Sequence, residues 1–141
     1  MVYSIIYKSK ADPTFNIFEI QKMLQRAKYF NKMNEITGII LYHKSQFIQL
    51  IEGEKGAIES LYASIMADER HHEVETILSK ASNQSLWMDW SMAFYDFSDP
   101  SDQTNYLRLL LESSFENANK KEKNSEVLSS LRTHTSLLLD H

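Results

Sequence analysis

The sequence contains no cysteine, which excludes disulfides, thiolate metal sites and cysteine nucleophiles. Glycine occurs only 3 times and proline only 2 times, so the glycine-rich loops that bind phosphates are absent. No apolar run approaches the length of a membrane span, and the first residues do not resemble a signal peptide. We therefore expect a cytoplasmic protein that does not insert into a membrane.

Positive charge is also not in excess. The 15 Lys and Arg residues are outnumbered by 19 Asp and Glu residues, and the formal net charge is -4. Affinity for nucleic acid comes from clustered Lys and Arg, so the composition gives no reason to expect a nucleic-acid partner. Hydrophobic residues make up 43% of the 141-residue chain, which suits one globular domain with a sizeable core.

The order of the predicted elements indicates the fold class. Five segments have the β-branched and aromatic composition of strands, namely residues 2–7, 36–42, 46–52, 74–80 and 90–94. Between them we expect one helix capped by Asn16, with Asn31 at or just past its end, and a second over residues 57–67. The apolar stripe of the first helix is predicted to be Ile17, Ile20, Leu24, Ala27 and Phe30. The order βαββαββ favours a ferredoxin-like α+β sheet with two helices on one face.

C-terminal helices are predicted to follow the sheet. Asp99 and Pro100 form a helix start, and a last amphipathic helix is expected over residues 125–138. The chain thus divides into a domain over residues 1–97 and a helical extension over residues 98–141. The apolar rows of the extension are Leu107, Leu110, Leu111 and Phe115, and then Leu128, Leu131 and Leu138. These rows either cover a bare sheet face or bind a partner, and both roles are compatible.

Gln49 is the most informative single residue. It lies in a strand-like segment in which Phe47 and Ile51 share its face, because side chains alternate along a strand. A buried amide without a hydrogen-bond partner costs about 1–3 kcal/mol, so Gln49 is expected to have one. The alternative is that this face of the strand is simply exposed to water.

Other polar clusters carry weaker signals. The run from Asp68 to His72 follows the second helix, but two adjacent histidines are poorly spaced for a metal, and a polar helix end explains such a cluster equally well. We expect no metal site. Glu52 and Glu54 flank Gly53 and are expected to be solvated. No motif marks a strained nucleophile turn, so a catalytic triad is not supported.

Taken together, six pieces of the sequence resemble the BLUF family of flavin-binding blue-light sensors. The pieces are Tyr7-Lys8-Ser9, Asn31, Ile36-Thr37-Gly38, residues 47–53, Asp68-Glu69-Arg70-His71 and Trp90-Ser91-Met92. The resemblance extends over roughly residues 2 to 95. It implies an oxidised flavin held non-covalently between the two helices and the sheet, either FAD or FMN.

The resemblance also implies a photochemical switch. Tyr7 would donate an electron and then a proton to the excited flavin, and Gln49, between Tyr7 and the ring, would rotate or change tautomer. Ser9 would bond Trp90 when the Trp is turned inward, and Met92 would be the alternative neighbour of Gln49.

Further contacts to the flavin follow from the same resemblance. Asn31 would bond the polar edge of the ring, and Asp68, Arg70 and His71 would lie near the ring edge, the ribityl chain or the phosphates. Lys32 stands where many members carry a second Asn, and would serve a phosphate or be solvated.

The expected function is therefore that of a short photoreceptor and not an enzyme. No output enzyme is recognisable after residue 97, so the signal is expected to leave through a partner protein or a change in a homo-oligomer. The alternative is a ferredoxin-like protein-interaction module without photochemistry. A small flavoenzyme is less favoured, because no substrate-activating group stands beside the redox site.

Overall fold

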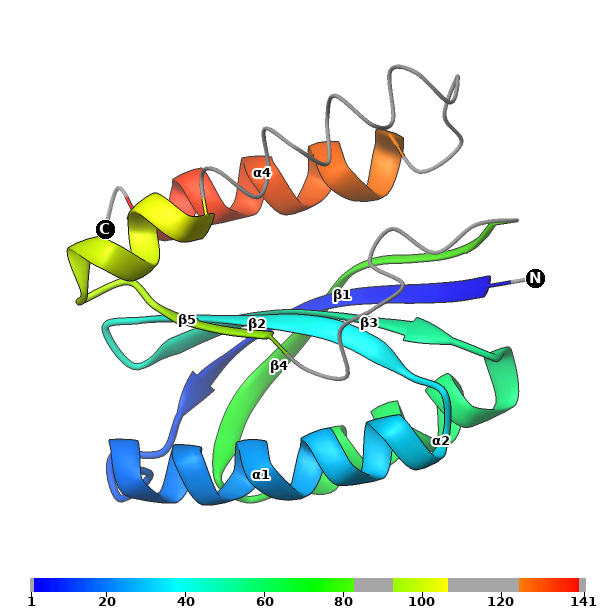
Figure 1. Ribbon diagram of the computed structural model, residues 1–141, viewed down its shortest axis with the longest axis horizontal. Coiled ribbons are helices and arrows are strands. Elements are labelled where there is room, and N and C mark those ends of the chain that lie inside the picture. The colour runs from blue at the N-terminus through cyan, green and yellow to red at the C-terminus, as the bar shows by residue number, and fades with distance from the viewer. Residues whose placement is uncertain (1, 83–92, 107–124, 140–141) are drawn as a thin grey trace.

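The computed structural model describes residues 2–82, 93–106 and 125–139 (Figure 1). Its elements are β1 (Val2–Ala11), α1 (Ile17–Met33), β2 (Thr37–His43), β3 (Gln46–Gly53), α2 (Lys55–Ala67), β4 (His71–Ser82), β5 (Ala93–Asp96) and α4 (Ser125–Leu139). The backbone is also helical over residues 100–106. Trp90, Met92, Leu107, Leu110, Leu111 and Phe115 lie outside the described residues, as does the side chain of Leu128.

The strands form one 5-stranded sheet in the order β4-β1-β3-β2-β5. All neighbours are antiparallel except β2 and β5, which are parallel. Figure 1 shows α1 and α2 on one face of the sheet, with α4 and the short helical segment on the other. The predicted ferredoxin-like α+β sheet with C-terminal helices is confirmed.

Helix α1 begins where its cap predicts and ends later than expected. The side chain of Asn16 accepts a hydrogen bond from the backbone N–H of Glu19 at 3.1 Å, which satisfies one free donor of the first turn. At the other end, the N–H of Asn34 bonds back to the carbonyl of Phe30 at 3.1 Å. Asn31 therefore lies within the last turn of the helix.

Strands β1 and β4 are longer than the sequence pattern predicts. They pair beyond residue 7 and before residue 74, up to the partners Ala11 and His71. Lys8 and Lys10 project from this stretch and form exposed ion pairs with Glu75, at 3.4 Å, and Glu73, at 3.0 Å. Their partners Glu73 and Glu75 lie on β4, an edge strand, where charged residues commonly discourage further pairing. The charged residues on both strands conceal these strand ends in the sequence pattern.

The hairpin between β2 and β3 turns on two residues instead of three. Lys44 and Ser45 both have positive φ, at 47° and 63°, while His43 remains in the strand. Positive φ at both central residues is typical of a type I′ turn, whose twist matches that of the two flanking strands. The described part of the predicted fifth strand begins at Ala93 and continues to Asp96, two residues beyond the predicted end.

The sheet separates two apolar clusters. Phe47 and Ile51 of β3 pack toward α1 and α2, whereas Ile48 and Leu50 pack toward the other side. Three residues of α4 are buried in that second cluster, namely Val127, Leu131 and Leu138. At least this helix of the extension therefore covers the sheet. The division of the chain at residue 97 stays a prediction.

Glu52 corrects one expectation. It was predicted to be solvated, but it is only 1% exposed and accepts a hydrogen bond from the Ser4 hydroxyl at 2.8 Å. It belongs to β3, one residue after Ile51, and so faces the layer that contains α4. Glu54 is exposed as expected, and its carboxylate caps α2 by accepting from the N–H groups of Gly56 and Ala57, both at 3.0 Å.

Gly38 supplies a test of this packing. A Cβ there would lie far inside van der Waals contact with the backbone carbonyl oxygen of Leu50, which cannot move without breaking the β2–β3 ladder. We expect Gly38→Ala to lower the free energy of unfolding by about 2 kcal/mol or more, measured by urea titration. Gly56→Ala is the control, because its nearest neighbour is the flexible Glu54 side chain at 3.1 Å. It should change stability by less than about 0.5 kcal/mol.

Candidate functional site

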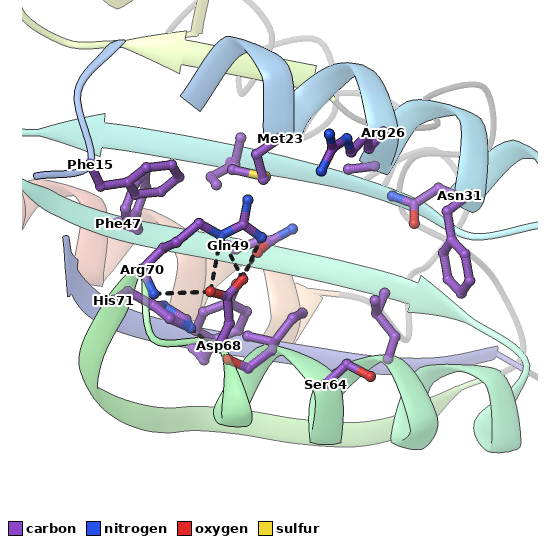
Figure 2. A pocket seen from close by; sticks show the side chains of 16 residues that line it. Phe15, Met23, Arg26, Asn31, Phe47, Gln49, Ser64, Asp68, Arg70 and His71 are labelled. Atoms are coloured by element: carbon purple, nitrogen blue, oxygen red, sulfur yellow. Dashed lines mark hydrogen bonds and ion pairs between the residues drawn. The ribbon is translucent and has the colours of Figure 1, made fainter. Parts of the chain in front are cut away.

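A cavity of about 270 Å³ lies between α1, α2 and the sheet. Figure 2 shows the 16 side chains that line it. Those from α1 are Met23, Arg26, Ala27, Phe30 and Asn31. Those from the strands are Tyr7, Ile40, Phe47, Gln49 and His71, and the others are Phe15, Leu61, Ser64, Ile65, Asp68 and Arg70. A mostly apolar hollow with a few converging polar groups is the usual form of a small-molecule site.

Tyr7 and Gln49 meet on the sheet wall of this cavity. They are direct partners in the β1–β3 register, so their side chains project from neighbouring strands on the same face. The Tyr7 hydroxyl donates a hydrogen bond to Oε1 of Gln49. Gln49 is 7% exposed, so the amide is buried and has a partner, and the alternative of a wet strand face is wrong.

The environment of Tyr7 keeps its phenol protonated. Burial raises its pKa well above the ordinary value, and the nearby Tyr62 and Asp68 raise it further. The Tyr62 ring lies 5.4 Å from the Tyr7 ring, centroid to centroid, and the His71 ring lies 6.3 Å away. Tyr7 therefore remains a hydrogen-bond donor toward Gln49.

His71 is fixed by hydrogen bonds at both ring nitrogens. Nε2 lies 2.6 Å from the carbonyl oxygen of Ile65, and Nδ1 lies 2.8 Å from the Ser9 hydroxyl. A carbonyl only accepts, so Nε2 carries a proton; in the neutral ring Nδ1 then accepts from Ser9. Ser9 thus reaches the cavity through His71. Its predicted bond to Trp90 involves a residue outside the described ranges and stays a prediction.

Asp68 and Arg70 form a closed ion pair at one end of the cavity. Nε of Arg70 bonds Oδ1 and Oδ2 of Asp68 at 2.9 and 3.0 Å, and Nη2 also donates to Oδ2. The hydrogen bonds from Arg70 hold the pKa of Asp68 below its ordinary value. The Arg70 guanidinium also lies over the Phe15 ring, 5.5 Å from its centroid.

Asn31 lies at the opposite end of the cavity from the Asp68–Arg70 pair (Figure 2). It is 1% exposed. The next residue, Lys32, is exposed and does not line the cavity. Of the predicted cofactor-binding residues in the described ranges, the cavity brings together Tyr7, Asn31, Gln49, Asp68, Arg70 and His71, with Ser9 behind His71.

Arg26 is a lining residue that the sequence analysis missed. The predicted stripe of α1 followed the core positions Ile20 and Leu24, which are buried under the sheet. Ala27 and Phe30 of that stripe line the cavity, together with Met23, Arg26 and Asn31, which lie beside the stripe on the helix surface. Counting back five residues from Asn31, somewhat more than one helical turn, would have found Arg26.

The chain can now be compared with known proteins. The family model described as BLUF, sensors of blue-light using FAD, matches residues 2–93. The chain belongs to the BLUF family. Its relatives include the blue light- and temperature-regulated antirepressor BluF of Escherichia coli, 31% identical over 78 residues, which are 55% of this chain and 19% of that protein. The photoactivated adenylate cyclase subunit alpha of Euglena gracilis is 34% identical over 84 residues, 60% of this chain and 8% of that protein. The chain thus spans less than a fifth of either curated relative.

Solved structures share the fold. Klebsiella pneumoniae BlrP1 with FMN and cyclic diGMP matches with a TM-score of 0.65 and 31% identity, over 70% of this chain and 26% of that one. The dark state of BlrB, a BLUF protein, matches with a TM-score of 0.69 over 94% of this chain and 96% of that one. At 24% identity, BlrB supports the fold alone.

Two other kinds of site were sought in the described part of the chain. No group of three or more His, Asp or Glu residues there is arranged to hold a metal ion. None of the helices described is both long and apolar enough to cross a membrane.

Two buried tyrosines predict a loss of stability at alkaline pH. Burial raises the pKa of Tyr7, and raises that of Tyr106 to about 12. Above the ordinary pKa of about 10, the unfolded chain loses these protons while the folded chain keeps them, so rising pH favours unfolding. The free energy of unfolding should fall by up to about 1.4 kcal/mol per pH unit for each tyrosine, measured by urea titration between about pH 9 and 11.5.

Phenylalanine variants identify which tyrosines cause the pH dependence of the free energy of unfolding. Tyr7→Phe and Tyr106→Phe should each make stability less dependent on pH over that range, whatever they do to stability at neutral pH. Tyr29→Phe, which removes an exposed hydroxyl on α1, should leave the slope unchanged. An equal slope in all four proteins would contradict the assignment.

Proposed function

We propose that this chain is a blue-light photoreceptor that holds an oxidised flavin non-covalently in the cavity between α1, α2 and the sheet. The observation that carries the proposal is the buried hydrogen bond from Tyr7 to Gln49 on the cavity wall. This bond joins a redox-active phenol to an amide that can exchange its donor and acceptor ends. Membership of the BLUF family supports the choice of flavin.

The lining of the cavity fits a flavin. The flat apolar ring would lie against aliphatic and aromatic side chains such as Ile40, Ile65 and Phe30. Its polar edge needs donors and acceptors, and the amides of Asn31 and Gln49 provide both. FAD is the flavin in the family description, while a solved relative is described with FMN, so both nucleotides are candidates here.

Tyr7 is proposed to be the source of the electron and the proton. When bound, the flavin supplies the absorption of blue light and an excited state that accepts an electron. A phenol that has lost an electron becomes strongly acidic, and Tyr7 already holds its proton in a hydrogen bond to Oε1 of Gln49. The proton thus has a defined path away from Tyr7.

Gln49 is proposed to be the switch. Rotation of its amide exchanges Oε1 for Nε2, so that a group that accepted from Tyr7 would instead donate toward it. Asn31, at the far end of the cavity, would hold the cofactor in place while this exchange occurs. A rearrangement of two hydrogen bonds is worth on the order of 1–2 kcal/mol, enough to bias two states that differ by little more.

The helical extension is proposed to carry the signal. Ile48 and Leu50 flank Gln49 in β3 and pack in the same cluster as Leu131 of α4. A shift of β3 at Gln49 would therefore move side chains that pack in the same cluster as α4. Residues 1–97 would act as the sensor and residues 98–141 as the output, without enzymatic activity of their own. The recipient would be a partner protein or a second copy of the chain.

Spectroscopy tests the photochemical proposal. Blue light should produce a small red shift of the flavin absorption that decays in the dark, with the flavin still oxidised. Gln49→Leu should retain the flavin and lose the shift, because leucine cannot exchange hydrogen-bond roles. Gln46→Leu is the matched control, since Gln46 lies in the same strand but does not line the cavity.

Because the chain has no cysteine, acid denaturation should release all of the flavin.

A second pair of variants tests the output. Leu131→Ala truncates a fully buried side chain of α4 and should lower the free energy of unfolding by about 2–5 kcal/mol. It should retain the light-induced spectral shift but abolish any light-dependent change in molecular size, measured by light scattering. Leu137→Ala, on the same helix at a side chain 52% exposed, should change neither. Light-dependent assembly that survives Leu131→Ala would place the output in the sensor domain.

A further inference from the structure

The charged groups that line the cavity do not balance. They are two guanidinium groups, Arg26 and Arg70, and one carboxylate, Asp68. The two hydrogen bonds of His71 are those of a neutral ring with a proton on Nε2. Arg70 and Asp68 neutralise one another through several hydrogen bonds. The lining therefore carries one positive charge that no lining carboxylate compensates.

That charge belongs to Arg26. Its side chain is exposed and extends from α1 along the cavity in Figure 2. The ion pairs found in the described ranges involve Arg70, His72 and four lysines but not Arg26. The acidic residue of the same helix, Glu19, pairs with Lys22 at 3.7 Å. Arg26 is thus a solvated cation on the α1 side of a cavity that is also lined by the buried amides of Asn31 and Gln49.

We propose that Arg26 binds the phosphate end of a flavin nucleotide and makes the site select phosphorylated flavins over riboflavin. The inference rests on the proposed flavin site. A ring whose polar edge meets the buried Asn31 and Gln49 leaves its charged tail for the exposed rim, where a phosphate keeps part of its hydration. The guanidinium fork of Arg26 matches phosphate oxygens and remains charged at every accessible pH.

The competing explanation is that Arg26 is one more solvated charge on a polar helix. Lys28 provides the comparison within the same helix. It is exposed like Arg26, lies two residues further along and so projects from a different side of α1, and does not line the cavity. If only the general positive charge of α1 attracts phosphate, Arg26 and Lys28 should matter equally.

The experiment measures binding of riboflavin, FMN and FAD to the apoprotein by quenching of flavin fluorescence. Arg26→Gln should weaken FMN and FAD by roughly three- to tenfold, the range expected of a partly exposed charged contact, and leave riboflavin unchanged. The affinity of Arg26→Lys for FMN and FAD should lie between those of the parent and of Arg26→Gln, because lysine keeps the charge and lacks the forked guanidinium group. Lys28→Gln should bind all three flavins as the parent does.

Ionic strength gives a second readout. The preference of the parent protein for FMN over riboflavin should decrease between about 50 mM and 500 mM salt, because an exposed ion pair is screened. The same preference in Arg26→Gln should be smaller and nearly independent of salt.

Several results would overturn the assignment. An equal loss of all three flavins in Arg26→Gln would mean that Arg26 acts through packing, and no loss would mean that it is only solvated. A loss confined to FAD would place Arg26 against the AMP half of FAD instead of the phosphate that FMN and FAD share. If the parent protein bound none of the three flavins, the proposed flavin site itself would be wrong. If Arg26→Gln bound the three flavins with the same preference as the parent, only the role of Arg26 would be wrong.

Discussion

An amide buried in an apolar sheet face must be hydrogen-bonded, and this constraint at Gln49 organises the site. Tyr7 meets it because the β1–β3 register sets the two residues directly opposite one another. That register in turn requires a strand order in which β1 lies beside β3, the arrangement that places α1 and α2 over the same face. The pair could not form in a sheet that joined β2 and β3 to β1 in a different order.

Asp68 and His71, which also line the cavity, are fixed by hydrogen bonds to their own partners. Both carboxylate oxygens of Asp68 bond to Arg70, and both ring nitrogens of His71 have partners. Such groups resist rearrangement, because moving any of them would break two contacts at once. In the proposed function, the change in hydrogen bonding is therefore assigned to Gln49, whose amide offers the same shape in two orientations.

The sequence predicted the elements that local patterns determine and missed those that depend on neighbours. The helix cap at Asn16, the alternation around Gln49 and the order of strands and helices were all visible. The ends of β1 and β4 were hidden, because Lys8 and Lys10 find their carboxylate partners only across the sheet. Glu52 appeared solvated for the same reason, since a helix from the end of the chain covers its face.

The cavity was predicted less completely than the fold, because the face of α1 that lines it coincides only in part with the predicted stripe: Ala27 and Phe30 belong to both, whereas Met23 and Arg26 lie beside the stripe. Ile20 and Leu24 anchor α1 to the sheet, and the neighbouring face then borders empty space instead of packed side chains. A residue on that face can be charged without a folding penalty, as Arg26 is, since part of it remains in water. Position on the helix and freedom from core packing together leave such a residue available to a ligand. The position could be inferred by counting back from Asn31, but the freedom from core packing depends on the sheet beneath the helix.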